Sequence, residues 1–190
     1  MSAKTHRVLP GFGLALGYTL VYLSGVSLSL YGAAGRERLL AALARARADG
    51  SKVAFDTNFR PRGWPDLEEA RAAFRRTIAE ADIVLASSED LEPLFGPEPP
   101  AELVRPGLEL VLKRADQTCR VTAPGVDLVV AAAPVARVVD TTAAGDSFAA
   151  AYLATRLAGG DPAAAAAAGH RLAGAVVGHR GAVIPREAMP

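Results

Sequence analysis

Short apolar runs alternate with longer helix-like segments along most of this chain, and this alternation limits its fold more than any other feature. The apolar runs are typical of buried strands and cover residues 19–25, 52–58, 82–88 and 107–114. Strands that alternate with helices form a mainly parallel sheet that is covered by helices on both faces. We therefore predict an α/β protein with a three-layer α/β/α architecture and a mainly parallel sheet.

The segments between these runs have the spacing of amphipathic helices. Gly50 ends the first segment as a C-cap residue, and Asp66 stands where the second needs an N-cap. We predict helices over residues 36–50, 65–81, 89–95, 144–158 and 162–177. The remaining apolar stretch, residues 119–134, predicts a hairpin that turns at Pro124 and Gly125.

The size and charge of the chain narrow its class further. A chain of 190 residues can form one domain with a substantial core, and its net charge of +1 gives no indication of a nucleic-acid partner. The single cysteine, Cys119, excludes an intrachain disulfide and favours the reducing cytoplasm. We expect this cysteine in the core. We predict an unassigned segment over residues 1–20 and one domain over residues 21–190.

The N-terminal stretch has no charged residue between Arg7 and Arg36, a pattern that also occurs in signal peptides and membrane helices. Glycine, proline and serine residues interrupt this stretch, and it contains no cleavage site of the Ala-x-Ala type. We therefore predict a buried strand within it and no membrane partner. A membrane anchor formed by residues 8–30 stays open as the alternative.

Three polar clusters follow predicted strands: residues 56–64, DTNFRPRGW, residues 87–90, SSED, and residues 140–148, DTTAAGDSF. In open α/β sheets, ligands bind in the crevice at the carboxyl ends of the strands. We therefore expect these three clusters to meet at one edge of the sheet and to form a binding site there.

The third cluster predicts a site for phosphoryl groups. Ala143, Ala144 and Gly145 are small, so they leave the backbone N–H groups at the start of a helix accessible to an anion. Asp146, in the first helical turn, could accept the proton of an attacking hydroxyl. An ordinary helix cap, in which Asp146 only interacts favourably with the helix dipole, explains the spacing equally well.

Five segments together resemble the PfkB (ribokinase-like) sugar kinases, in chain order from about Val21 to Pro190. They are YLSGVSLSLYG (22–32), DTNFRPRGW (56–64), KRADQTC (113–119), DTTAAGDSFAAAYLATRLAGG (140–160) and HRGAVIPREAMP (179–190). The similarity is strongest to the branch that phosphorylates the sugar acid 2-dehydro-3-deoxygluconate at its 6-hydroxyl. The resemblance implies a ribokinase-like fold, ATP and Mg²⁺ as cofactors, and a sugar acid and ATP as small-molecule partners, with a homo-oligomer as a further form of association.

The resemblance also implies roles for individual residues. Asp146 would be the general base and the backbone of Ala143, Ala144 and Gly145 the anion hole. Arg60 would bind the substrate carboxylate beside Asn58, with Arg62 as the alternative contact, although both arginines could be plain surface charges. The nucleotide would contact Ser87, Lys113, Arg114, Thr142, Gly145 and His170, and Asp90 would act weakly and indirectly on the metal.

The sequence departs from the family at individual residues and in an upstream segment. Ser87 and Asp90 stand where relatives have asparagine and glutamate, and Ala115 replaces a glycine, which would strain the turn if that position needs a positive φ. Relatives also carry sheet strands, a sugar-binding segment and a lid upstream of Tyr22. We therefore expect these N-terminal strands and the lid to be missing and expect little turnover. A non-catalytic remnant that at most binds nucleotide is the competing hypothesis.

Overall fold

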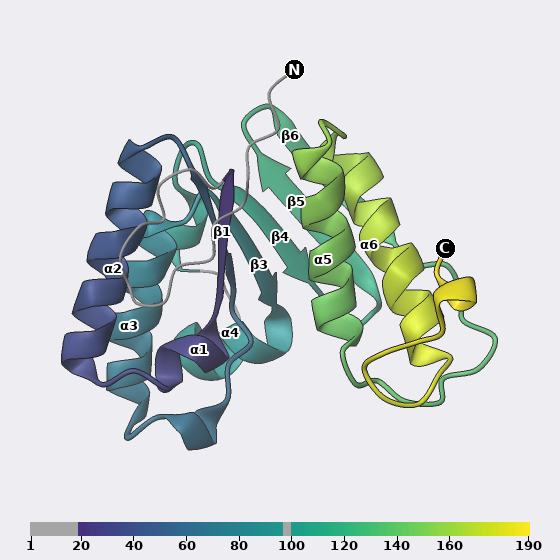
Figure 1. The fold of residues 1–190 in the computed structure, drawn as a ribbon, viewed down its shortest axis with the longest axis horizontal. Helices are drawn as coiled ribbons and strands as arrows, with labels where there is room; N and C mark the ends of the chain where they lie inside the picture. Colours follow the sequence, from purple (N-terminus) through teal and green to yellow (C-terminus); the bar gives the residue numbers. More distant parts are fainter. Residues whose placement is uncertain (1–18, 97–99) are drawn as a thin grey trace.

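The computed structural model describes residues 19–96 and 100–190 and confirms the predicted alternation of strands and helices (Figure 1). The first half contains β1 (Leu20–Ser24), α1 (Gly25–Ser29), α2 (Ala33–Ala48), β2 (Lys52–Asp56), α3 (Leu67–Glu80), β3 (Ile83–Ser87) and α4 (Ser88–Phe95). The second half contains β4 (Glu109–Lys113), β5 (Thr118–Ala123), β6 (Val126–Ala131), α5 (Ala144–Leu157) and α6 (Pro162–Val177). Short 3₁₀ turns cover Pro61–Gly63, Ala101–Val104 and Arg186–Ala188.

The six strands form one sheet in the order β1-β2-β3-β4-β5-β6. Strands β1 to β4 pair in parallel, and the β5–β6 hairpin adds two antiparallel pairings at the far edge. The hairpin turns at Pro124 and Gly125 as predicted, and Gly125 has a positive φ of 73°. The fold is therefore the predicted three-layer α/β/α architecture with a mixed sheet whose first four strands are parallel.

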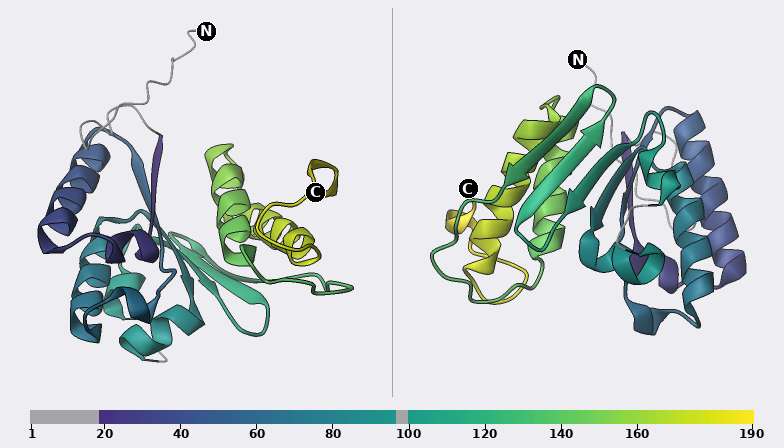
Figure 2. Two further views of the ribbon diagram at one scale, coloured as in Figure 1. Left: turned by 60° about the horizontal axis from the view of Figure 1, so that its bottom comes forward. Right: turned by 180° about the vertical axis from the view of Figure 1, so that it is seen from behind.

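Helices cover both faces of the sheet, and each face has its own core (Figures 1 and 2). Alternate strand residues face opposite ways, so Phe55 packs against α3 on one side while Ala54 belongs to the core beneath α5 and α6. Phe74 of α3 is central to the first core, and Tyr152 of α5 is central to the second. Cys119 is fully buried in the second core, and this burial raises the pKa of its thiol to about 11.

A buried charge network fixes α5 to the sheet. The Arg156 guanidinium binds both carboxylate oxygens of Glu109, with Nε–Oε1 and Nη2–Oε2 distances of 2.8 and 2.7 Å, and the Tyr152 hydroxyl donates to Oε1 at 2.7 Å. Bidentate pairs of this kind restrict orientation as well as distance. These contacts fix the C-terminal half of α5 at the start of β4. The N-terminus of the helix is thereby positioned over the carboxyl ends of the parallel strands.

The helix boundaries follow the predicted capping residues. The Asp66 carboxylate accepts from the Glu69 N–H at 2.7 Å, and Gly50 has a φ of 90° directly after α2. Helix α1 was not predicted, because a helix of five residues is too short for a periodic pattern. Residues 1–18 lie outside the described part of the chain. In the part that is described, none of the helices is both long and apolar enough to cross a membrane.

Candidate active site

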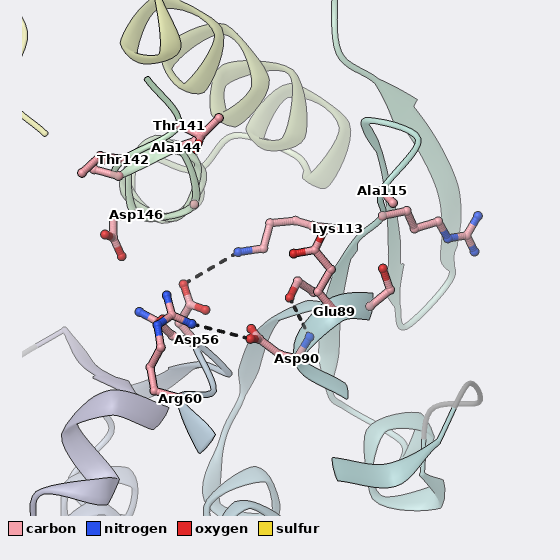
Figure 3. A pocket seen from close by; sticks show the side chains of 16 residues that line it. Asp56, Arg60, Glu89, Asp90, Lys113, Ala115, Thr141, Thr142, Ala144 and Asp146 are labelled. Atoms are coloured by element: carbon pink, nitrogen blue, oxygen red, sulfur yellow. Dashed lines mark hydrogen bonds and ion pairs between the residues drawn. The ribbon is translucent and has the colours of Figure 1, made fainter. Parts of the chain in front are cut away.

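The three polar clusters meet in one cleft at the carboxyl ends of the parallel strands, as predicted (Figure 3). The prediction that the third cluster directly follows a strand is wrong, because β6 ends at Ala131 and a loop leads from there to Asp140. The cleft has a volume of about 690 Å³. It is lined by Asp56, Asn58, Arg60, Ser87, Ser88, Glu89, Asp90, Lys113, Arg114, Ala115, Thr141, Thr142, Ala143, Ala144, Gly145 and Asp146. The residues come from the ends of β2, β3 and β4 and from the start of α5, so one edge of the sheet brings together segments that lie far apart in the sequence.

The start of α5 presents unpaired backbone donors to this cleft. Ala143, the N-cap residue, adopts a left-handed conformation with φ 60° and ψ 13°, which reverses the chain direction before the helix. The Ala144 N–H donates to the Thr141 carbonyl oxygen at 3.2 Å. Within the described residues, the N–H groups of Ala143, Gly145 and Asp146 donate to no protein acceptor. Free donors at a helix N-terminus favour the binding of an anion.

Asp146 lies in the first turn of α5 with an exposed side chain. Figure 3 shows its carboxylate pointing into the cleft, toward Asp56 and Arg60. The carboxylate is therefore adjacent to the free N–H groups, and it can also contact a second group that binds in the cleft. This is the arrangement that a general base beside a phosphoryl site requires.

The turn before α5 is held by Asp140. Its carboxylate accepts from the Thr142 N–H and from the Gly181 N–H, both at 2.9 Å. Hydrogen bonds from Thr142, followed by the one from Gly181, lower the pKa of Asp140 to about 2. The ionised carboxylate thus links the turn before α5 to the C-terminal segment.

We expect the variant Asp140→Asn to be less stable than the wild type at pH 7 and to approach it in strong acid. A carboxylate with a lowered pKa in the folded state stabilises the protein above its unfolded pKa, near 3.8, and this stabilisation is lost as the pH falls toward about 2. Melting temperatures of both proteins between pH 7 and pH 2 measure the effect. A difference that does not change with pH would contradict it.

The loop after β2 places Asn58 and Arg60 at the cleft and is fixed by Asp90. The Asp90 carboxylate accepts from the Thr57 hydroxyl at 2.8 Å and from the Phe59 N–H at 3.0 Å, and it lies 3.9 Å from the Arg60 guanidinium. Asn58 has a positive φ of 30°, which turns the loop toward the cleft. Asp90 therefore shapes this loop, and its two oxygens are engaged by the protein itself.

Ser87 caps α4 in this structure: its hydroxyl accepts from the Asp90 N–H at 3.1 Å. Lys113 extends from the end of β4 to within 3.9 Å of the Asp56 carboxylate. Asp56 is 3% exposed and also accepts from the Tyr22 hydroxyl at 3.4 Å. Burial raises the pKa of Asp56, while the Lys113 ammonium lowers it. Partial burial and the carboxylates of Asp56 and Asp146 raise the pKa of Tyr22.

Two predicted residues do not line the cleft. Arg62 is exposed on the 3₁₀ turn Pro61–Gly63. His170, on α6, borders a second, mostly apolar cavity of about 440 Å³ between β6, α6 and the chain end at Pro190. Its Nε2 lies 3.1 Å from the Val130 carbonyl, its ring packs edge-on against Phe148, and burial lowers its pKa.

Ala115 is not strained, contrary to the concern raised by the missing glycine. In the turn between β4 and β5 the left-handed position falls on Gln117, with φ 61°, and Ala115 is absent from the positive-φ residues of the described ranges. The Gln117 N–H donates to the Arg114 carbonyl oxygen at 3.1 Å, and this hydrogen bond closes the turn. Alanine at position 115 therefore fits this turn without a positive φ.

A parallel sheet with free backbone N–H groups and a carboxylate at one helix N-terminus has the features that phosphoryl-transfer sites require. Residues 17–189 match the model of the pfkB family carbohydrate kinases, and the chain belongs to this family. It is 42% identical over 181 residues to 2-dehydro-3-deoxygluconokinase of Escherichia coli K12 and 44% identical to the enzyme of the same name from Dickeya dadantii. The alignments cover 91% of this chain and 59% and 58% of those relatives, so the chain spans less than two thirds of their length.

Solved structures of the same fold class agree with this assignment. A putative ribokinase II from Escherichia coli, in complex with ATP and Mg²⁺, superposes with a TM-score of 0.74 at 26% identity and covers 86% of this chain and 54% of its own. Aminoimidazole riboside kinase from Salmonella enterica, complexed with aminoimidazole riboside and an ATP analogue, gives a TM-score of 0.72 at 26% identity over 87% of this chain and 58% of its own.

Proposed function

We propose that this chain is the nucleotide-binding and catalytic part of an ATP-dependent sugar-acid kinase that phosphorylates 2-dehydro-3-deoxygluconate at its 6-hydroxyl. One observation carries the proposal: free backbone N–H groups at the start of α5 and the Asp146 carboxylate face the same cleft. Phosphoryl transfer depends mainly on positioning and charge stabilisation, together with one group that orients and deprotonates the nucleophile. The identity to 2-dehydro-3-deoxygluconokinases supports the choice of substrate.

The phosphates of ATP would bind at the N-terminus of α5, where Thr142 and Gly145 border the cleft beside Lys113 and Arg114. The adenine would occupy the second cavity beside His170, which is apolar enough for a base. The ring of His170 packs against Phe148 and its Nε2 faces the Val130 carbonyl, so His170 would contact the base through its ring. A reaction that uses ATP fits a cytoplasmic protein.

The sugar acid would bind on the opposite side of the cleft. Arg60 is exposed there and points into the cleft, where its guanidinium can pair with the substrate carboxylate in a fork geometry (Figure 3). Asn58 of the same loop would contact a substrate hydroxyl. Arg62 is the less suited of the two arginines, since it does not line the cleft. Asp146, between the two binding regions, would accept the proton of the attacking hydroxyl.

Mg²⁺ would enter the cleft with the nucleotide. Within the described residues, no group of three or more metal-ligating side chains is arranged to hold an ion by itself. This suits Mg²⁺, which usually keeps several waters and is bound through substrate phosphates and one or two carboxylates. Several carboxylates line the cleft, and Asp90 among them would act on the ion indirectly, because it fixes the loop after β2. The ion would neutralise charge on the phosphates.

The competing proposal is a non-catalytic protein that at most binds nucleotide. The share of the relatives' length that the chain spans, 58–59%, favours it, because residues that complete the sugar site in those relatives can lie outside the matched part. The kinase proposal requires ATP to bind, whereas the competing proposal does not. The transfer of phosphate to the sugar acid separates them.

We expect Mg·ATP at millimolar concentration to raise the melting temperature of the chain, since a ligand that binds only the folded state stabilises it. Gly145→Val should abolish this rise. The Cβ atom of residue 145 would lie 3.7 Å from the Lys113 ammonium, so the fold can accept a side chain there while the phosphate position is blocked.

The matched control is Ala154→Val, which introduces the same side chain at an exposed position of α5 away from the cleft. It should keep the full rise in melting temperature. A wild-type protein that shows no rise at millimolar Mg·ATP would contradict the proposed function, and a Gly145→Val variant that keeps the rise would contradict the location of the phosphates.

A further inference from the structure

Asp56 and Lys113 form an ion pair on the floor of the cleft that the assignment of the nucleotide site does not explain. We propose that Asp56 is a positioning residue, which holds the Lys113 ammonium beside the N-terminus of α5 so that it binds the phosphoryl groups together with the free backbone N–H groups. The inference rests on the proposed function, because it assumes that phosphate binds at this turn.

The fold places the two side chains on the same face of the sheet. Asp56 ends β2 and Lys113 ends β4, with the end of β3 between them: Asp56 pairs with Leu85, and Ser87 pairs with Lys113. Leu85, the partner of Asp56, and Val111, two residues before Lys113, both belong to the core beneath α5. Because alternate strand residues face the same side, Asp56 and Lys113 also face α5. The lysine side chain therefore crosses over the end of β3 beneath the helix and meets Asp56 with an Nζ–Oδ2 distance of 3.9 Å (Figure 3).

The position of the ammonium depends on Asp56. A lysine side chain has four rotatable bonds, and it loses considerable conformational entropy when a ligand alone must order it. Here Asp56 is fixed first, because its side chain is only 4% exposed and accepts from the Tyr22 hydroxyl. The Lys113 side chain is 20% exposed, which is low for a lysine at a cleft. The carboxylate thus holds the ammonium in place before any ligand enters.

The held ammonium faces the phosphate position. Nζ of Lys113 lies 3.7 Å from the point where a Cβ atom on Gly145 would lie, and the Gly145 N–H is one of the free donors. An anion bound to this N–H group therefore lies within reach of Nζ. The longer 3.9 Å contact with Asp56 leaves the ammonium donors available to that anion, whereas a tight bidentate pair would occupy them.

A double-mutant cycle on nucleotide affinity tests the inference in the chain as it exists. Isothermal titration with Mg·ATP compares the wild type, Lys113→Met, Asp56→Asn and the double variant. We expect Lys113→Met to weaken binding about tenfold in the wild-type background, as is typical for a charged hydrogen bond. In the Asp56→Asn background the same change should weaken binding only about twofold, because the lysine is no longer held.

Arg114→Met is the matched control, since Arg114 is a cation that lines the same cleft from the next position and has no ion pair with Asp56. Its effect on affinity should be equal in both backgrounds. Inorganic tripolyphosphate, titrated in the same way, should show the same coupling between Asp56 and Lys113, since the ammonium acts on phosphate. If Asp56 only stabilised the fold, Asp56→Asn would change the losses of affinity on Lys113→Met and on Arg114→Met to the same extent. Asp56→Ser replaces Asp56→Asn if the latter fails to fold by circular dichroism.

The outcomes are distinct. An equal loss on Lys113→Met in both backgrounds would overturn the positioning role of Asp56 and leave the proposed function standing. No binding of Mg·ATP by the wild-type chain would overturn the proposed function, and the inference with it. A loss that shrinks in the Asp56→Asn background, for ATP and tripolyphosphate but not for the Arg114 control, supports the inference.

Discussion

Replacing Gly25 by alanine will destabilise the fold by about 3 kcal/mol or more. A Cβ atom at this position would lie 2.0 Å from the Thr57 carbonyl oxygen and 2.6 Å from the ring of Phe74. Gly25 begins α1, where the chain passes directly over the end of β2, and the obstructing carbonyl belongs to the loop that carries Asn58 and Arg60. Relief of the clash therefore requires the backbone at the cleft to move.

Urea unfolding followed by circular dichroism measures this effect, with Gly32→Ala as the control. Gly32 precedes α2, and no atom lies within 4 Å of the position that its Cβ would occupy. The control should therefore change the free energy of unfolding by less than about 1 kcal/mol. A Gly25→Ala protein as stable as this control would show that α1 does not pass so close to the loop after β2.

Replacing Asp146 by asparagine should reduce phosphorylation of 2-dehydro-3-deoxygluconate by about 10²–10⁴-fold, the usual effect of losing a general base. The carboxamide keeps the shape of the side chain but cannot accept the hydroxyl proton. Because the chain spans 59% of the Escherichia coli relative, the assay uses this chain joined to the part of that relative that it does not span. Sugar-acid-dependent release of ADP measures the turnover.

Binding of Mg·ATP should be unchanged or slightly tighter in the Asp146→Asn protein, since a negative charge near the phosphates is removed. Asp127→Asn makes the same chemical change on the β5–β6 hairpin, where Asp127 pairs with Arg120, and should leave turnover within twofold. Arg60→Ala should mainly raise KM for the sugar acid, because it removes a carboxylate contact and leaves the base in place. An Asp146→Asn protein with turnover within tenfold of its parent would contradict the role of Asp146.

The sequence predicted those parts of the fold that depend on local patterns. The two closing helices and the hairpin at Pro124 and Gly125 have strong periodicity and clear turn residues, and the structure places them within a few residues of the predicted bounds. Helix α1 was missed because its five residues carry no period, and its place depends on the close approach of Gly25 to Thr57. That approach is a tertiary contact, which no local pattern reveals.

The candidate site shows the same division. The position of Asp146 in the first turn of a helix follows from the residues around it, and the structure confirms that position. The pairing of Asp56 with Lys113 was missed, because it joins two strands that are separated by a third and depends on which face of the sheet each side chain takes. A signal was present, since Asp56 ends an apolar run and an aspartate at that point must find a partner.

The most direct test of the account is a titration of the ¹⁵N-labelled chain with Mg·ATP, followed by NMR through its backbone amides. We expect the amide resonances of Ala143, Gly145 and Asp146 to shift in a saturable manner, because these N–H groups are the free donors at the N-terminus of α5. The amide resonances of α2, which lies on the opposite face of the sheet, should not shift. Resonances of the first turn of α5 that remain unchanged at several times the concentration that saturates binding elsewhere would contradict it.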